Sequence, residues 1–196
     1  SLITLYEGGD ARQQIERMAR EQQDGAKALI VMPVAENELE EALAEKRIQI
    51  PLVLVNSELP RDKVSSVVTA DFDAMGRNLA KQILEEHGNS IPVYLFYSHR
   101  ESAARQHFQD GVETVLKSGK CEIKKFERHG DGTFRKAIEE LVYPETARAV
   151  IIALDPESLL ETAAILADSS VYPEHVDGLY GRGTTTPVLN YLDRGV

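Results

Sequence analysis

Apolar runs of strand length alternate along the chain with segments of helical period. The runs are mostly continuous, which is typical of strands that are buried on both faces of a parallel sheet. CEIKKF mixes charged and apolar residues, which favours a place near a sheet edge. The runs are LITLY (2–6), ALIVMPV (28–34), PLVLV (51–55), SSVV (65–68), PVYLFY (92–97), CEIKKF (121–126), AVIIAL (149–154) and VDGLY (176–180).

Between these runs, apolar residues recur three and four positions apart, as they do on one face of a helix. A β-α-β-α alternation of this regularity predicts an α/β fold, with mostly parallel sheets flanked by helices and right-handed crossovers. The helical segments are 11–23, 36–47, 72–88, 102–119, 134–142, 157–168 and 185–193. Residues that favour helix ends flank them: the N-cap aspartates Asp10, Asp71 and Asp155, and the terminal glycines Gly25, Gly88, Gly119 and Gly195.

Size and charge narrow the class of protein. The 196 residues are enough for one or two domains. The net charge of −10 argues against nucleic-acid binding by this segment, because phosphate contacts need a clustered positive surface.

The single cysteine, Cys121, excludes an internal disulfide and a multi-cysteine metal site, and we expect it to be buried or half-buried. The chain begins within the apolar SLITLY, so we expect that an upstream segment has been removed.

The sequence contains no recognisable catalytic pattern. It has neither a nucleophile elbow nor a phosphate-binding loop, and the glycines of GLYGRG (178–183) are spaced in the reverse of the dinucleotide fingerprint. His99 and His107 lack the spacing and cysteine support of a zinc site. We therefore predict no catalytic residues, no metal site and no cofactor.

The stretch SHRESAAR (98–105) follows the apolar run PVYLFY at a strand-to-helix corner, where ligands bind in parallel α/β folds. Ser98 and Glu101 have the spacing of a capping box. Arg105 would then lie near the start of the helix, where a positive charge opposes the helix dipole. A guanidinium there suits the paired hydroxyls or the carboxylate of a small ligand. The residues alone support a structural role and a ligand-binding role for Arg105 equally.

Three stretches resemble the type 1 periplasmic-binding-protein fold, which sugar-binding proteins of ABC transporters share with the effector domains of LacI-type repressors. GAKALIVMPVAENELEEALAEKRIQIPLVLVNS (25–57) resembles the family's passage of strand, polar loop, helix and strand. VSSVVTADFDAMGRNLAKQIL (64–84) resembles its crossover between lobes. SAARQHFQDGV (102–112) resembles the helix start that supplies a ligand-binding arginine in family members.

The resemblance implies two Rossmann-like lobes with parallel sheets flanked by helices, an N-terminal lobe over residues 1–69 and a C-terminal lobe over 70–196. The family's first strand and helix have no counterpart here, so we expect an incomplete first lobe and a fragment of a longer protein. Either that lobe rearranges, or a strand exchanged with another chain, or a dimer, completes it.

Several positions depart from the family's sugar-binding pattern. Asn56 and Ser57 replace its Asp-Arg pair, Leu154 stands where an asparagine is common, and Tyr180 occupies the position of an aspartate. Carboxylates bind sugar hydroxyls well because charged acceptors make the stronger hydrogen bonds. These departures leave the ligand class open, and a ligand with its own acid, or a more apolar one, would fit better.

The resemblance implies non-enzymatic binding of a small polar solute, a sugar or a sugar-like molecule, in a cleft between two lobes that close about a hinge near residues 69–71. The predicted ligand contacts are Arg105, Asp155, Tyr180, Ser98 and Asn56.

As the solute-binding component of an ABC transporter or a sensor, the protein would work with a membrane permease or sensor. It would then be extracellular or periplasmic, either free or anchored to the membrane. The alternative is the cytoplasmic effector-binding domain of a LacI-type transcriptional regulator, and an enzyme on a doubly wound fold is a third hypothesis.

Overall fold

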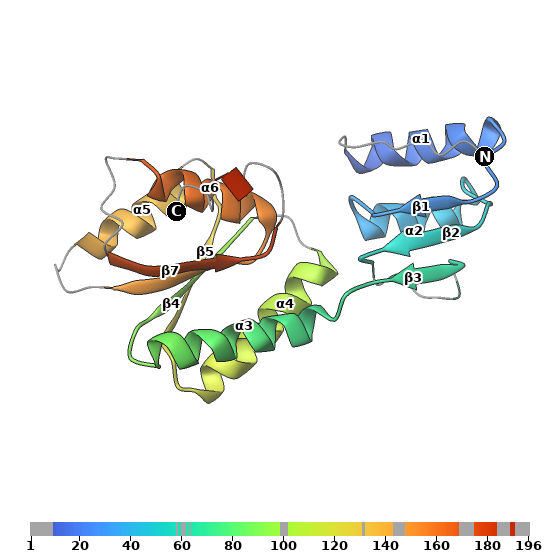
Figure 1. Cartoon of the computed structure of the whole chain (residues 1–196). Coiled ribbons are helices and arrows are strands. Elements are labelled where there is room, and N and C mark those ends of the chain that lie inside the picture. The colour runs from blue at the N-terminus through green and yellow to red at the C-terminus, as the bar shows by residue number, and fades with distance from the viewer. Residues whose placement is uncertain are drawn as a thin grey trace. The chain divides into compact units, whose positions relative to one another are not determined.

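The structure is a computed structural model that forms two compact units, one of residues 1–71 with 102–104 and one of residues 72–101 with 105–196 (Figure 1). The predicted strand at 2–6, Gly195 and most of the predicted helix at 185–193 lie outside the described residues, as do His99 and Glu101. The predicted lobe limits, 1–69 and 70–196, stay a prediction. The described residues are 10–57, 59, 62, 64–98, 102–130, 132–142, 148–168, 175–183 and 189–190.

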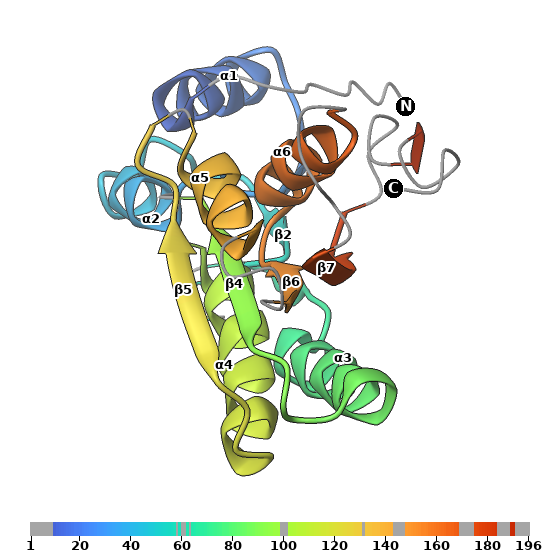
Figure 2. The same ribbon diagram turned by 90° about the vertical axis from the view of Figure 1, so that its left-hand side faces the viewer.

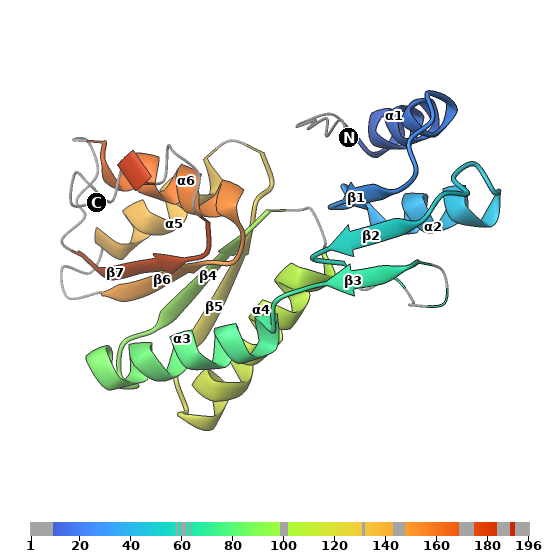
Figure 3. The ribbon, with the colours of Figure 1, turned by 45° about the vertical axis from the view of Figure 1, so that its right-hand side comes forward.

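The first unit contains a parallel sheet in the order β1-β2-β3. Its strands are β1 (Leu29–Val31), β2 (Leu52–Val55) and β3 (Ser66–Val68), and its helices are α1 (Ala11–Gln23) and α2 (Glu36–Ala44) (Figure 3). Met18 of α1 and Leu39 of α2 pack with Val31 and Leu54 in one buried cluster. Ile30 of β1 and Val68 of β3, by contrast, are 78% and 59% exposed. The predicted strand exchange or dimer at this sheet stays a prediction.

The second unit contains a parallel sheet in the order β5-β4-β6-β7, and the mixed run CEIKKF lies at its edge, as predicted. Figure 2 shows the four strands side by side with helices on both faces of the sheet. The strands are β4 (Val93–Tyr97), β5 (Ile123–Glu127), β6 (Ala149–Ala153) and β7 (Val176–Gly181). The helices are α3 (Phe72–His87), α4 (Ala103–Ser118), α5 (Thr133–Glu139), the 3-10 turn η1 (Glu140–Val142) and α6 (Pro156–Leu166).

The continuous apolar runs of β4 and β6 are buried on both faces, as the sequence predicts. Val93 and Leu95 pack with Phe108 and other residues of α3 and α4. Alternate residues of the same strand, such as Phe96, pack with Phe134 of α5 on the opposite face. The α/β fold with parallel sheets flanked by helices is therefore confirmed.

Helices α3 and α4 cross with their backbones in contact. A Cβ atom on Gly76 would overlap the carbonyl oxygen of Phe108 and lie 2.9 Å from the backbone nitrogen of Val112. A Cβ atom on Gly111 would overlap the carbonyl oxygen of Asp73 in the same way. Only glycine permits this approach, which fixes the first two turns of α3 against the middle of α4.

Most of the predicted helix ends are confirmed. Asp10 and Asp155 cap α1 and α6 through their side chains, and Gly25 and Gly88 have φ angles of +95° and +73°. The predicted end at Gly119 is confirmed as well, since α4 ends at Ser118, and the positive φ of 58° in the turn that follows belongs to Lys120. The backbone nitrogen of Cys121 then donates to the carbonyl oxygen of Leu116 and closes a Schellman motif.

No helix in the described part of the chain is both long and apolar enough to cross a membrane.

Candidate functional site

The carboxyl end of the sheet in the second unit gathers polar and aromatic side chains. Because β4, β6 and β7 are parallel, the residues that follow them meet at one edge. These residues are Ser98 after β4, Asp155 after β6 and Arg182 after β7. Arg105 and Phe108 come from the start of α4, and Phe72 from the start of α3. This edge is the candidate functional site of the second unit.

Asp155 ties two strand ends together. Its side chain is buried, and its Oδ1 accepts a hydrogen bond from the backbone nitrogen of Ser158 at 2.9 Å. Its Oδ2 accepts from the Ser158 hydroxyl at 3.0 Å and from the backbone nitrogen of Ser98 at 2.8 Å. The structure thus brings the predicted site residues Ser98 and Asp155 together. The carboxylate of Asp155 serves as the N-cap of α6, and its bond to Ser98 also links β4 to α6.

Arg105 lies in the first turn of α4 and is only 5% exposed. Its guanidinium lies over the ring of Tyr97, the last residue of β4, at 5.1 Å from the ring centre. Its Nη1 donates to Oε1 of Gln109 at 3.0 Å, and Gln109 donates in turn to Glu113 at 2.7 Å. The ring and the amide hold the guanidinium in one orientation at the strand end.

Arg182 is a site residue that the sequence analysis missed. Its Nε donates to the carbonyl oxygen of Leu154 at 3.1 Å. Its guanidinium lies over Phe72 at 4.7 Å and over Phe108 at 5.5 Å from the ring centres. The signal was its place just after the last predicted strand, where the sequence analysis selected only Tyr180.

The charges of Arg105 and Asp155 both act on Arg182. Burial lowers the pKa of Arg182 below its usual value, and the positive charge of Arg105 lowers it further. The negative charge of Asp155 opposes both effects. The three side chains therefore form one electrostatic group, called here the arginine pair with Asp155.

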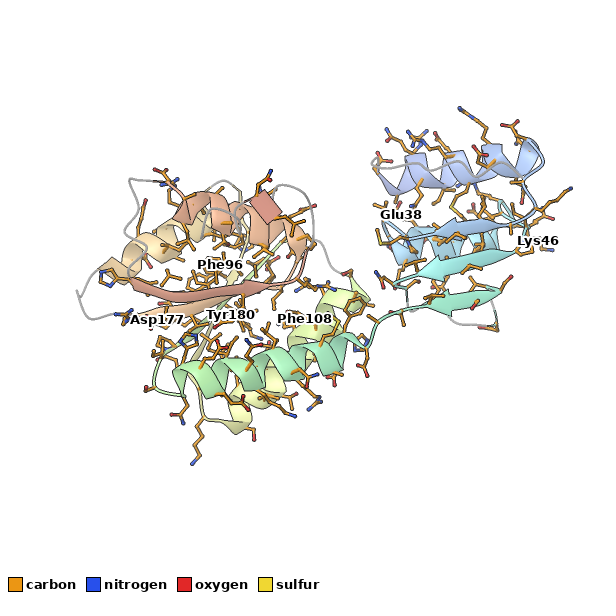
Figure 4. All side chains as sticks on the ribbon, viewed as in Figure 1. Glu38, Lys46, Phe96, Phe108, Asp177 and Tyr180 are labelled. Carbon is orange, nitrogen blue, oxygen red and sulfur yellow. The ribbon has the colours of Figure 1, made fainter. Side chains whose placement is uncertain are left out.

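Tyr180 lies apart from this group. Its hydroxyl donates to the carboxylate of Glu86 and lies 2.8 Å from Nε2 of His87, both in the last turn of α3. Between Phe72 and Glu86 that helix rises about 21 Å, so the hydroxyl is at the end of α3 that is remote from Arg182. Figure 4 shows Tyr180 nearer than Phe108 to the C-terminal end of α3. Burial and the bond to Glu86 raise the pKa of Tyr180 to about 12.

Asn56 belongs to the first unit, where it follows β2 and is exposed. Its backbone nitrogen donates to the carbonyl oxygen of Val68 at 2.9 Å, and its φ is 52°. Asparagine tolerates this left-handed conformation because its short side chain bonds locally. The backbone role explains the residue type, and its predicted contact with ligand stays a prediction.

Within the described residues there is no group of three or more His, Cys, Asp or Glu side chains that could hold a metal ion. Asp73 is paired with Arg77, with Oδ2 at 2.6 Å from Nε. Cys121 is buried, as predicted, and burial raises the pKa of its thiol.

Comparison with known proteins gives a family and a fold. A family model described as periplasmic binding protein domain matches residues 1–196. No curated protein matches the sequence.

Several solved structures share the fold at low sequence identity. A periplasmic ribose ABC transporter protein of Conexibacter woesei is 18% identical with a TM-score of 0.70, and the match covers 95% of this chain and 64% of that chain. A complex of the TorS sensor domain with TorT, solved without ligand, is 18% identical with a TM-score of 0.72, covering 94% and 64%.

A probable maltose operon transcriptional repressor, MalR, of a Staphylococcus species is 13% identical with a TM-score of 0.67, covering 93% of this chain and 70% of that chain. The chain thus spans 64% of the length of each of the first two structures.

Proposed function

Because the chain belongs to the periplasmic binding protein domain family, we propose that it binds a small polar solute, a sugar or a sugar-like molecule, without transforming it chemically. It would do so as the solute-binding component of an ABC transporter or of a sensor. The likeness to a ribose transporter protein and to a sensor complex supports these two settings. In either setting the protein acts in the periplasm or outside the cell, and its partner is a membrane permease or a membrane sensor.

The observation that carries the proposal is the arginine pair with Asp155 at the carboxyl end of the second sheet. Arg105 and Arg182 each carry a planar fork of donors, which suits ligand oxygens that accept two hydrogen bonds. The Ser98 hydroxyl at the same edge offers both a donor and an acceptor. We propose Arg105, Arg182 and Ser98 as the contacts of the solute in this unit.

The two guanidiniums are fixed before any solute arrives. Tyr97 and Gln109 orient Arg105, while Phe72, Phe108 and the Leu154 carbonyl orient Arg182. An arginine that is already ordered loses less conformational freedom on binding, and this lowers the cost of association. Such preorganisation is the expected property of a binding site rather than of a charged surface.

The experiment is a thermal-shift screen of the protein with sugars, polyols and small organic acids, followed by calorimetry of each solute that raises the melting temperature. Replacing Arg105 with Met removes charge-assisted hydrogen bonds, each worth about 1.5–3 kcal/mol. We therefore expect Arg105→Met to weaken binding by roughly 10- to 100-fold.

Arg148→Met is the matched control. Arg148 precedes β6, so it lies at the amino ends of the strands, away from the candidate site, and its Nε pairs with Asp177 at 2.6 Å. We expect it to bind the solute as the unaltered protein does. Binding by Arg105→Met at full affinity, or no solute that binds at all, would contradict the proposal.

The second candidate is the effector-binding domain of a LacI-type transcriptional regulator, which the likeness to MalR favours. A binding measurement does not distinguish the two hypotheses, because both classes of protein bind a small molecule. The gene sequence upstream of Ser1 distinguishes them: a secretion signal there supports the solute-binding protein, and a helix-turn-helix supports the regulator.

A further inference from the structure

A row of polar side chains runs along one face of α4 at intervals of four residues, a spacing that places neighbours side by side on a helix. Arg105, Gln109 and Glu113 in this row are each at most 8% exposed, and Lys117 continues it towards solvent. Arginine and glutamate are rarely buried unless they are paired. The row, called here the α4 polar row, is therefore a built network rather than a solvated helix face.

Hydrogen bonds connect the α4 polar row from end to end. Lys117 donates to Oε2 of Glu113 at 2.6 Å, and Nζ of Lys125 on β5 lies 2.5 Å from Oε1 of Glu113. Nε2 of Gln109 donates to the same Oε1 at 2.7 Å. Oε1 of Gln109 accepts from Nη1 of Arg105 at 3.0 Å. The network thus extends from the two lysines to the guanidinium at the candidate site.

The charge of Glu113 decides which way the amide of Gln109 faces. Burial alone would raise the pKa of Glu113, but hydrogen bonds from the two lysines and Gln109 outweigh it and lower the pKa to about 2. An ionised carboxylate only accepts hydrogen bonds, whereas an amide has a donor end and an acceptor end. The NH₂ group of Gln109 must therefore face Glu113, and its oxygen must face Arg105. With the amide turned over, two donors would meet at Arg105 and two acceptors at Glu113.

We infer that Gln109 and Glu113 are positioning residues of the solute site, which act on the solute through the guanidinium of Arg105. This role rests on the proposed function, because Arg105 is a proposed contact of the solute. The ring of Tyr97 lies over the guanidinium, and the amide of Gln109 holds one of its nitrogens. An ordered guanidinium loses less conformational freedom on binding, so solute affinity depends on the direction of this amide.

The test is a double-mutant cycle on solute affinity, measured by calorimetry at pH 7. The probes are D-ribose, D-arabinose, D-galactose, D-galacturonate and the hits of the thermal-shift screen, and the tightest binder among them is used with every variant. Gln109→Met keeps the length of the side chain and removes both ends of the amide. We expect affinity to fall roughly three- to tenfold. In a protein that already carries Arg105→Met, we expect the same change to cost less than about twofold.

Gln106→Met is the matched control, since Gln106 donates to Asp110 at 2.9 Å on the exposed side of the same helix. We expect it to bind the probe as the unaltered protein does. A substitution that only loosens α4 would lower affinity equally with and without Arg105. Equal losses in the two backgrounds, or full affinity of Gln109→Met, would therefore overturn the inference and leave the proposed function standing.

Glu113→Gln tests the far end of the α4 polar row. Its amide has one oxygen for the donors that the carboxylate accepts, so the fixed direction of Gln109 is lost. We expect affinity to fall roughly two- to fivefold, and less than about twofold once Arg105→Met is present. Unchanged affinity would overturn the role of Glu113, and this variant alone decides if Gln109→Met does not fold. If no probe binds the unaltered protein, the inference and the proposed function both fail.

Discussion

Asp155 accepts a hydrogen bond at 2.8 Å from the backbone nitrogen of Ser98, a residue 57 positions earlier in the chain. The same carboxylate caps α6 through Ser158. One buried side chain therefore holds the carboxyl ends of β4 and β6 in register. Arg105 and Arg182 lie at the same end of the sheet. The site and the stability of the second unit depend on the same carboxylate.

Asp155→Asn tests this double role. An amide has one acceptor oxygen, so one of the two groups, the backbone nitrogen of Ser98 or that of Ser158, would face an NH₂ group. We expect the free energy of unfolding to fall by about 1–3 kcal/mol, because a buried donor is left without its acceptor. Chemical denaturation followed by circular dichroism measures the change.

The matched control is Asp10→Asn at the exposed N-cap of α1, where the Asp10 side chain accepts from the backbone nitrogen of Gln13. Asparagine caps a helix as well as aspartate does, so we expect a change of less than about 0.5 kcal/mol. Equal effects of the two substitutions would show that the link from Asp155 to Ser98 contributes nothing.

Gly76→Ala tests the contact between α3 and α4. In an isolated helix this change would stabilise by up to about 1 kcal/mol. Here the added Cβ overlaps the carbonyl oxygen of Phe108, so we expect a loss of about 1–3 kcal/mol instead. Asn78→Ala, at an exposed position of the same helix, should be neutral or slightly stabilising. Thermal unfolding of both variants measures the difference, and stabilisation by Gly76→Ala would contradict the crossing.

Glu113 makes the stability of the second unit depend on pH in the acid range. Burial alone would raise its pKa, but hydrogen bonds from Lys117, Lys125 and Gln109 outweigh it and lower the pKa to about 2. A lowered pKa stabilises the fold above the unfolded value near 4.5, and this stabilisation is lost as the pH falls towards 2. The difference corresponds to about 3 kcal/mol.

Glu113→Gln should therefore lower the unfolding free energy at pH 7 and make little difference at pH 2. Denaturation with urea between pH 2 and pH 7 measures this convergence. In Glu122→Gln, which alters an exposed carboxylate 3.5 Å from Lys124, we expect no such convergence. A constant difference between Glu113→Gln and the unaltered protein over this range would exclude the ion pairs as its cause.

Tyr180→Phe separates a structural role from a ligand contact. The hydroxyl already donates to Glu86, and we expect its removal to cost about 1 kcal/mol of stability while solute affinity changes less than twofold. In alkaline solution, one tyrosine that ionises near pH 12 should disappear from the ultraviolet titration.

Because the raised pKa stabilises the fold below about pH 10, the difference between Tyr180→Phe and the unaltered protein should shrink as the pH rises from 10 to 12. Unchanged stability with a tenfold loss of affinity would instead support the predicted contact between Tyr180 and the solute.

The helices and most of the strands of this protein could be predicted from the amino-acid sequence. Continuous apolar runs distinguished the buried strands β4 and β6 from the amphipathic helices, whose apolar residues recur three and four positions apart. A strand that is buried on both faces has apolar residues at almost every position. Asp10, Asp155 and Gly25 marked helix ends correctly, since capping depends on the local backbone and on side chains a few residues away. The dipole of its own helix left Arg105 equally open to a structural and a ligand-binding role, and only the family resemblance made it a predicted ligand contact.

Contacts between residues that are remote in the sequence could be read only from the folded chain. Arg182 joins Arg105 because strand order sets β7 next to β6 and the helix crossing at Gly76 and Gly111 brings Phe72 and Phe108 beside its guanidinium. Tyr180, two residues earlier, contacts the far end of α3 instead. Such contacts join residues that are remote in sequence, and their partners depend on strand order, register and packing, none of which leaves a local pattern in the chain.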